Sequence, residues 1–466
     1  MCVANLSDPI RTLAEFLAKI RFDDLPKEVV EQARYLILDS LGCALGGSRT
    51  ELGRVVVETV KSLGGNPEAT IIGDGIKTSS VFAAHVNAIL VDALDFEDTF
   101  HGLGHPSATV IPAALAVAEK ERANGEQLIT AVVGAYEVAV RLGFAMRPCT
   151  RKGKFGSFQY WHTFGAAAAA SKILELDVDG ILTAFGYAGA SSPLPTYTGA
   201  RGFRRRPLTW IKDNFGEITA AGVLGALLAK KNFIAPRAPD LDFWQEYTSD
   251  EERYQKVVDG IGADYKILLT GFKPFTACRY IHSALGGLQK VLQENKLVAD
   301  QVQSVVVHSH HDVATDFAVY EPRNMVDAEF SLPYTAAMVM LGKKPGLGWY
   351  SDEAMKNPAT LENARKVQIR YSEESDRLLN QEGYRNRRVL AIVEVTTKDG
   401  RHFQKRVELT KGDPADPLTR TQLVEKFQDL AVSAALPMHK TEAILNIVTN
   451  LKSLDDASEL GQLLCP

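Results

Sequence analysis

Hydrophobic residues recur on one helical face through the first half of the chain. After the start signal Ser7-Asp8-Pro9, the apolar positions are Ile10, Leu13, Phe16, Leu17 and Ile20, which is the spacing of an amphipathic helix. Pro26 is expected to open a second helix, with Gly42 near its end. Alanine-rich segments continue the pattern at residues 81–95, 110–121, 127–142, 165–174 and 216–230. Because small residues let helices approach closely, this half predicts a helical bundle.

The pattern changes after about residue 270. A β-branched run at 303–308 predicts a strand, residues 330–341 predict a helix, and residues 389–397 and 402–409 flank an Asp-Gly turn typical of a hairpin. Helical periodicity returns from Thr419, and residues 412–414 are where the chain is expected to cross back to the helical domain. We therefore predict a mainly α protein: a discontinuous all-helical domain (1–270 and 415–466) and a smaller α+β lid domain (271–414).

Composition and charge narrow the class of protein. The 466 residues are 45% hydrophobic and 23% charged, with a net charge of −5 and a pI near 6.1, which predicts a globular protein and argues against a nucleic-acid partner. An anionic substrate would therefore need local positive charge. An acidic N-terminus and scattered cysteines predict a cytoplasmic protein with reduced thiols. The apolar stretch 131–142 is interrupted by Glu137 and Arg141, so no membrane span is expected.

The densest polar cluster runs from residue 92 to residue 105. If the preceding helix continues to residue 99, Asp95 and Thr99 lie four apart on one face. Gly102-Leu103-Gly104 would then break the helix and let His105 fold back toward Asp95. A carboxylate beside an imidazole suits general acid/base catalysis. An ordinary acidic helix end with a capping turn explains the same residues about as well.

Other polar residues carry weaker signals. The spacing of His101 and His105 occurs in metal sites, but the glycines between them disfavour a continuous helix, and no metal is predicted. His162 precedes a five-alanine run, where it is either a buried polar group or a functional one. Lys212 is either a snorkelling surface residue or an anion ligand at a helix start, and Lys273 precedes Pro274 at the expected domain junction. The basic loop 201–206 is either a solvated turn or a funnel for carboxylates.

Taken in order, several blocks resemble the MmgE/PrpD family, which includes 2-methylcitrate dehydratase, cis-aconitate decarboxylase and iminodisuccinate epimerase. The resemblance covers nearly the whole chain. It is carried by LPKEVVEQARYLILDSLGCALGG (25–47), ALDFEDTFHGLGHPS (93–107), WHTFGAAAAASKIL (161–174), KPFTACRYIH (273–282), AEFSLPYTAA (328–337) and KGDPADPLT (411–419).

The resemblance implies a helical domain closed by its own C-terminal helices, a smaller lid, and a homodimer. It implies that His105, Asp95, His162 and Tyr334 are catalytic and that Thr99, Lys212 and Lys273 bind substrate. It also implies a small di- or tricarboxylic acid as substrate and no cofactor.

The resemblance leaves the reaction open. We expect a lyase similar to 2-methylcitrate dehydratase, with decarboxylation and epimerisation as alternatives, because all three develop charge beside a carboxylate. Two departures from the family pattern bear on this choice: the basic loop 201–206, and Ser283 where a proline is common. A catalytically silent or metal-binding homologue is the alternative from another class.

Overall fold

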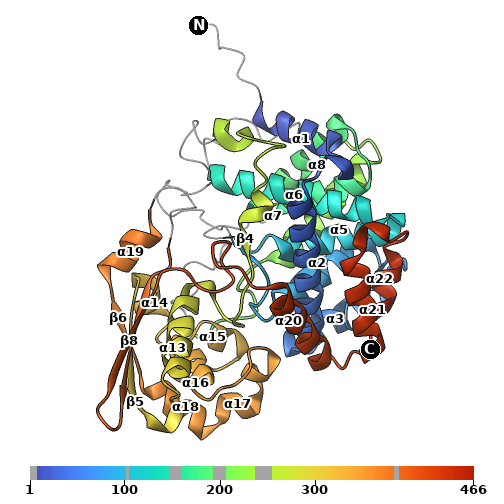
Figure 1. Cartoon of the computed structure of the whole chain (residues 1–466). Helices are drawn as coiled ribbons and strands as arrows, with labels where there is room; N and C mark the ends of the chain where they lie inside the picture. Colours follow the sequence, from blue (N-terminus) through green and yellow to red (C-terminus); the bar gives the residue numbers. More distant parts are fainter. Residues whose placement is uncertain (1–7, 101–103, 147–159, 193–205, 237–253, 382–387) are drawn as a thin grey trace, which may run out of the picture.

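The computed structural model describes residues 8–100, 104–146, 160–192, 206–236, 254–381 and 388–466. Its architecture confirms the predicted fold class, a discontinuous helical domain with a smaller α+β lid (Figure 1). The helices of the large domain within these ranges are α1 (Pro9–Lys19), α2 (Lys27–Gly47), α3 (Glu51–Leu63), α4 (Ser80–Asp92), α5 (Ser107–Glu121), α6 (Gly125–Met146), α7 (Tyr160–Ile173), α8 (Val178–Ser191), α10 (Phe215–Ala229), α20 (Arg420–Ser433), α21 (Met438–Thr449) and α22 (Ser458–Leu463).

The first two helices begin where the sequence predicts. The Asp8 side chain caps α1 by accepting a hydrogen bond from the backbone N–H of Ile10 at 3.0 Å. Pro26 is the N-cap of α2. However, α2 continues to Gly47, so Gly42 does not mark its end. A Cβ at Gly42 would lie 3.2 Å from Phe427 of α20, which shows that this glycine serves close helix packing.

The centre of the large domain is formed by α4, α5, α7 and α10, which pack on one another. A Cβ at Gly222 of α10 would lie 2.7 Å from Ala166 and from the Thr163 carbonyl of α7, so only glycine allows this approach. Helix α6 is long and apolar enough to cross a membrane, but 94% of its most apolar window is buried inside the protein. Its burial identifies it as a core helix of this bundle.

The lid is built on a four-stranded sheet of order β6-β5-β7-β8. Strand β5 (Val302–Ser309) pairs in parallel with β6 (Val367–Tyr371) and antiparallel with β7 (Ala391–Thr397), which forms the predicted hairpin with β8 (His402–Val407). Gly400 has a φ of 85° in the connecting turn. Helix α13 (His282–Glu294) packs on β7 and β8. The other lid helices are α14 (His311–Asp316), α15 (Met325–Glu329), α16 (Leu332–Met340), α17 (Asp352–Lys356), α18 (Pro358–Arg365) and α19 (Glu373–Leu379).

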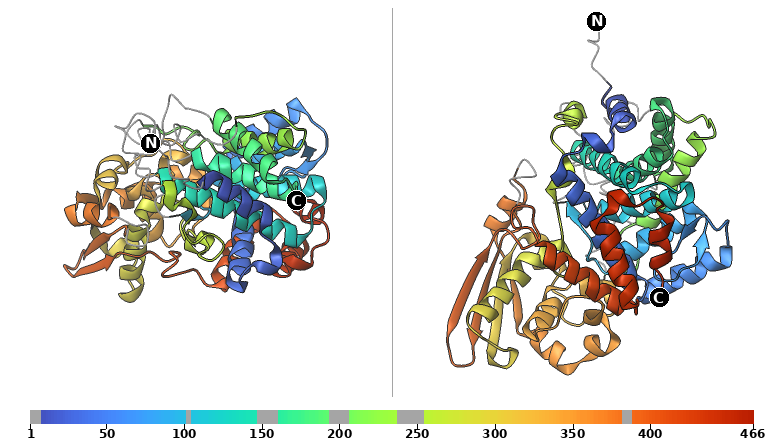
Figure 2. Two further views of the ribbon diagram at one scale, coloured as in Figure 1. Left: turned by 90° about the horizontal axis from the view of Figure 1, so that it is seen from above. Right: turned by 45° about the vertical axis from the view of Figure 1, so that its right-hand side comes forward.

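The chain returns from the lid to the large domain through Gly412. This glycine has a φ of 89°, and a Cβ there would lie 1.9 Å from the Phe272 carbonyl oxygen. Helices α20 and α21 then pack against α2, and α22 packs against α5 (Figure 2). Two short antiparallel pairs complete the fold: β1 (Ala69–Thr70) with β2 (Lys77–Thr78), and β3 (Thr99–Phe100) with β4 (Thr270–Gly271). The domain bounds at 270 and 415 stay predictions.

Candidate active site

The acidic segment after α4 is not helical, which corrects one sequence-based expectation. Helix α4 ends at Asp92, and Asp95 adopts a left-handed φ of 47°, a conformation that aspartate tolerates better than most residues. Asp95 and Thr99 therefore do not share a helical face. Instead, Thr99 lies in β3 opposite Gly271 of β4. This pairing brings the acidic segment beside the segment that carries Lys273.

His105 folds back onto the acidic segment. Gly104, with a φ of 90°, bridges to Phe100 and reverses the chain. The Nδ1 atom of His105 lies 2.7 Å from the Asp98 carbonyl oxygen and 3.0 Å from Oε1 of Glu97. Its Nε2 atom lies 3.9 Å from Oδ1 of Asp95. The expected proximity of Asp95 and His105 is thus present, and Glu97 is the nearer carboxylate.

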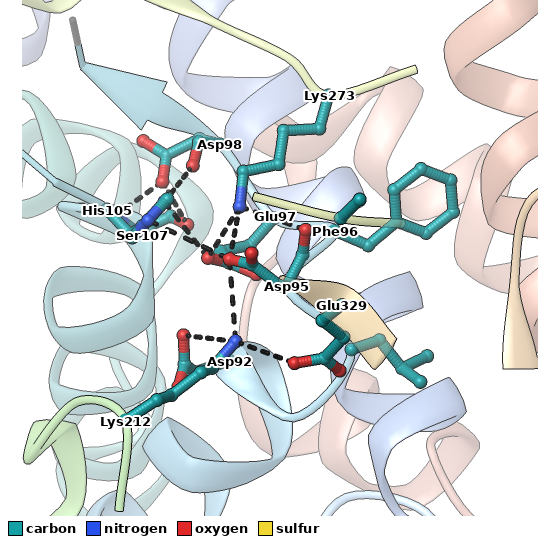
Figure 3. Close-up of polar contacts among 12 residues, drawn as sticks. Asp92, Asp95, Phe96, Glu97, Asp98, His105, Ser107, Lys212, Lys273 and Glu329 are labelled. Carbon is teal, nitrogen blue, oxygen red and sulfur yellow. Dashed lines mark hydrogen bonds and ion pairs between the residues drawn. The ribbon is translucent and has the colours of Figure 1, made fainter. Parts of the chain in front are cut away.

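Lys273 is fully buried and joins these carboxylates. Its Nζ lies 2.6 Å from Oδ1 of Asp95, 2.9 Å from the Asp95 carbonyl oxygen and 3.4 Å from Oε1 of Glu97 (Figure 3). Asp95, Glu97 and His105 could together offer three ligand atoms to a metal ion. Because the Lys273 ammonium already lies between two of these side chains, a metal ion would have to displace it.

Lys212 connects the large domain to the lid. Its Nζ lies 3.4 Å from Oδ1 of both Asp92 and Asp95, and 3.5 Å from Oε2 of Glu329. Glu329 is the last residue of α15 in the lid and is completely buried. Figure 3 shows Lys212 and Lys273 reaching Asp95 from opposite sides. The site is therefore assembled from both domains.

The carboxyl groups of this cluster differ in charge. Burial alone would raise the pKa of Asp95, but Lys212 and Lys273 outweigh it and hold that pKa well below its usual range. Burial of Glu97 is likewise outweighed by Lys273 and His105, which lower its pKa to about 2. By contrast, burial raises the pKa of Asp92 to about 8 in spite of Lys212.

Glu329 completes this charge pattern. Burial raises the pKa of Glu329 well above its ordinary value, although Lys212 opposes the shift. Near pH 7, Asp95 and Glu97 are then charged and Asp92 is largely protonated, while burial favours the neutral form of Glu329. Lys212 and Lys273 bring two cations to one buried cluster, which suits an anionic ligand.

The His105 imidazole is charged at neutral pH. Burial and the Lys273 charge both lower its pKa, but Glu97 and then Asp95 outweigh them and raise the pKa of His105 to about 9. The group is consequently an acid, able to give a proton to a substrate.

Asp98 fixes the position of the turn that carries His105. Its Oδ1 accepts hydrogen bonds from the N–H of Ser107 at 3.2 Å and from the Ser107 hydroxyl at 2.7 Å. Its Oδ2 accepts one from the Tyr136 hydroxyl at 2.8 Å. Burial raises the pKa of Asp98 to about 6, against the effect of these donors. These bonds fix the residue whose carbonyl oxygen contacts Nδ1 of His105.

His162 lies near the cluster but not in it. It is buried in the first turn of α7, and its ring centroid lies 5.3 Å from that of Phe215. The Phe215 ring is also 6.3 Å from the His105 ring, edge to face with both histidines. Phe215 is thus an apolar neighbour of both imidazoles that the sequence did not single out.

Tyr334 lies in the core of the lid. Its hydroxyl donates a hydrogen bond to the Trp349 carbonyl oxygen, and its ring stacks on Tyr350 at 6.4 Å. The Tyr350 hydroxyl donates to the Thr276 carbonyl oxygen, three residues beyond Lys273. Tyr334 therefore supports the Lys273 segment from behind. The catalytic roles of His105, Asp95, His162 and Tyr334, and substrate binding by Thr99, Lys212 and Lys273, stay predictions.

Sequence reasoning missed several residues of the cluster. Glu97 and Asp98 belong to the acidic run but were given no role, and Glu329 stands in the AEF block beside Tyr334. The signal for all three was an acidic residue inside an otherwise apolar block, which is rare unless the carboxyl has partners.

The basic loop has one described residue, Arg206. Arg206 donates to Oδ1 of Asp327 at 2.8 Å and to the carbonyl oxygens of Asp316 and Phe330, at 2.6 and 2.9 Å. It thus ties the large domain to the lid rather than standing free for a substrate. His101 and residues 201–205 lie outside the described residues.

Comparison with known proteins gives matches along most of the chain. The model of the MmgE/PrpD N-terminal domain matches residues 11–241, and that of the MmgE/PrpD C-terminal domain matches residues 275–453. Human cis-aconitate decarboxylase is 27% identical over 96% of this chain and 92% of that protein. The cis-aconitate decarboxylase of Aspergillus terreus is 25% identical over 97% of this chain and 95% of that protein. That of Mus musculus is 24% identical over 98% and 94%.

Proposed function

This chain belongs to the MmgE/PrpD family, and on that premise we propose that it is a decarboxylating lyase acting on a small unsaturated tricarboxylic acid of the cis-aconitate type. The expectation of a lyase agrees with the similar proteins, which are named cis-aconitate decarboxylases. Those names favour the decarboxylase alternative over the 2-methylcitrate dehydratase reading. No cofactor is part of the proposal.

The observation that carries the proposal is the charged state of His105. Decarboxylation of such an acid breaks a carbon–carboxylate bond, and CO2 leaves. The electron pair of that bond forms a new double bond, and the pair of the old double bond moves to the carbon beside another carboxylate. That carbon must then receive a proton. The His105 imidazolium, with its pKa raised to about 9, supplies a proton at neutral pH and regains one from water afterwards.

The lysines fit the charge that develops in this reaction. Electron density moves toward a retained carboxylate of the substrate, and an ammonium group beside that carboxylate stabilises it. In the proposed complex, carboxylates of the substrate take the place of protein carboxyls beside Lys212 and Lys273. Thr99 and His162 are proposed to orient the remaining oxygens, and Tyr334 is proposed to act indirectly by supporting the Lys273 segment through its stacking on Tyr350.

Dehydration and epimerisation make a different demand on the same residue. Both begin when a base removes a proton from carbon. The imidazolium form of His105 has no lone pair to accept that proton, so the charged state supports proton delivery instead.

The test is turnover of a panel of acids in D2O, followed by NMR. We expect cis-aconitate to lose CO2 and to gain one deuterium at carbon, while 2-methylcitrate, citrate and simple dicarboxylates remain unchanged. His105→Gln should lower kcat about 10²- to 10⁴-fold, the usual contribution of a general acid. His439→Gln, an exposed histidine of α21, is the matched control and should keep wild-type activity.

Other outcomes would point elsewhere. Loss of water from 2-methylcitrate would support the dehydratase reading, and deuterium exchange with inversion would support an epimerase. Activity that EDTA abolishes and a divalent ion restores would overturn the metal-free mechanism.

A further inference from the structure

A third buried lysine lies behind the cluster, on a helix from the end of the chain. Lys426 of α20 has its Nζ 2.7 Å from Oδ1 of Asp39 in α2. The same atom donates to the Phe96 carbonyl oxygen at 2.5 Å and to the Lys273 carbonyl oxygen at 3.2 Å. It also lies 4.0 Å from the centroid of the Phe96 ring. Lys426 therefore donates two hydrogen bonds to main-chain oxygens and forms an ion pair with Asp39.

The two carbonyl groups belong to the two segments that make the cluster. Phe96 stands between Asp95 and Glu97 in sequence, and Lys273 supplies the ammonium that those carboxylates share. Lys426 therefore binds the main chain directly behind the charged side chains. Its contacts are with backbone oxygens, an aromatic ring and Asp39, so it is not placed to bind a substrate.

Side-chain distances in the cluster depend on this main-chain contact. The Lys273 ammonium lies 2.6 Å from Oδ1 of Asp95 and 3.4 Å from Oε1 of Glu97, and both separations require the two segments to stay in register. The β3–β4 ladder joins the end of the acidic segment to the residues just before Lys273, and it has only two residues in each strand. A short ladder of this kind is weak by itself. The Thr276 hydroxyl also donates to the Leu94 carbonyl oxygen at 2.7 Å, and Lys426 adds a charged connection that binds the main chain of both segments.

We propose that Lys426, paired with Asp39, is a positioning residue that holds the Asp95–Glu97 segment and the Lys273 segment together so that Lys273 stays beside Asp95 and Glu97. This inference rests on the proposed function for its kinetic consequences. The geometric part, the spacing of the two segments, does not depend on which substrate is used.

The first test is the double variant Asp39→Asn with Lys426→Met. Removing both partners avoids leaving a buried charge without its counter-ion. We expect kcat to fall roughly 10- to 100-fold because misplacement by about 1 Å has effects of that size. KM should change less than about threefold, since the lysines that bind substrate remain. Loosened contacts with Glu97 and Asp95 should also lower the pKa of His105, measured by NMR titration of the imidazole.

The control is Arg49→Met, which breaks another connection between the same two helices. Arg49 follows α2, and its Nε donates to the carbonyl oxygen of Ala434, the C-cap of α20, at 2.9 Å. We expect Arg49→Met to lower Tm while leaving kcat and the pKa of His105 unchanged. Equal effects of both variants on kcat and on that pKa would mean general loosening and would overturn the positioning role.

Further outcomes separate this inference from the proposed function. A folded double variant with unchanged kcat and unchanged His105 pKa would overturn the inference alone. If the wild-type protein turned over none of the acids, the proposed function would fail, but the NMR titration would still test the positioning. Lys426→Gln, whose amide can still donate to a carbonyl, is the milder second variant. If neither variant folds, Lys426 is required for folding, and the inference that it positions the site is wrong.

Discussion

The pairing of His105 with Glu97 can be tested by replacing Glu97 with glutamine, which keeps the shape of the side chain and removes its charge. The pKa of His105 is raised from 6.5 to about 9, which corresponds to roughly 3 kcal/mol in favour of the imidazolium. Glu97 supplies the larger part, since its oxygen lies 3.0 Å from the ring and that of Asp95 lies 3.9 Å away. Burial and Lys273, which lower the pKa, remain in the variant.

We therefore expect the pKa of His105 in Glu97→Gln to fall to 6.5 or below. At pH 7.5 most molecules would then hold a neutral imidazole, and kcat/KM should drop about 10- to 100-fold. The assay is kcat/KM from pH 5.5 to 10, because its limbs report groups of the free enzyme. The alkaline limb should move from near pH 9 to near pH 6.5. NMR titration of the imidazole measures the same group directly.

The sign of the effect on stability follows from the same shift. A folded-state pKa above the ordinary value stabilises the fold fully below about pH 6.5, and this stabilisation is lost as pH rises through about 9. The difference in unfolding free energy between wild type and Glu97→Gln should shrink over that interval. Glu408→Gln, an exposed lid residue paired with Arg406, is the control. An alkaline limb within about half a unit of wild type would refute the assigned pairing.

Two further predictions concern Lys212 and its lid partner. Lys212→Ala removes a cation that attracts the substrate, so it should raise KM roughly 10- to 100-fold and weaken the dependence of kcat/KM on salt. An unchanged KM at low ionic strength would contradict this prediction. Glu329→Gln should keep kcat/KM at neutral pH within about threefold, because burial raises the pKa of Glu329 and favours the neutral carboxyl, which glutamine resembles. As pH rises, the variant should lose less activity than wild type, since glutamine cannot ionise and compete with substrate for Lys212; an equal decline would refute the prediction.

Local features of the fold could be predicted from the sequence because their causes are local. Asp8 caps α1 and Pro9 begins it. The Asp-Gly turn at 399–400 connects the two strands of a hairpin, and along β7 buried residues alternate with partly buried ones. The return of His105 toward Asp95 was also predictable, since Gly104 adopts a backbone conformation that few residues accept. In each case neighbouring residues supply the physical reason.

The contacts that define the site could not be predicted in this way. The sequence allows the helix to continue to residue 99, but the ion pair with Lys273 and the pairing of Thr99 with Gly271 favour a left-handed turn at Asp95 instead. Tertiary contacts thus overrode local propensity. Glu329 reaches Lys212 from the lid, and no pattern within either segment encodes that distance.

The pairing of Asp39 with Lys426 has a consequence for the order in which the protein is made. A chain emerging from the ribosome presents α2 long before α20, because domains form from the N-terminal side as synthesis proceeds. Until α20 arrives, the Asp39 carboxyl has no cation in the place that Lys426 takes. In the nascent helical half, the Asp39 carboxyl is therefore either exposed to water or protonated. The ion pair can form only after α20, which ends at Ser433, has been synthesised and has docked on α2.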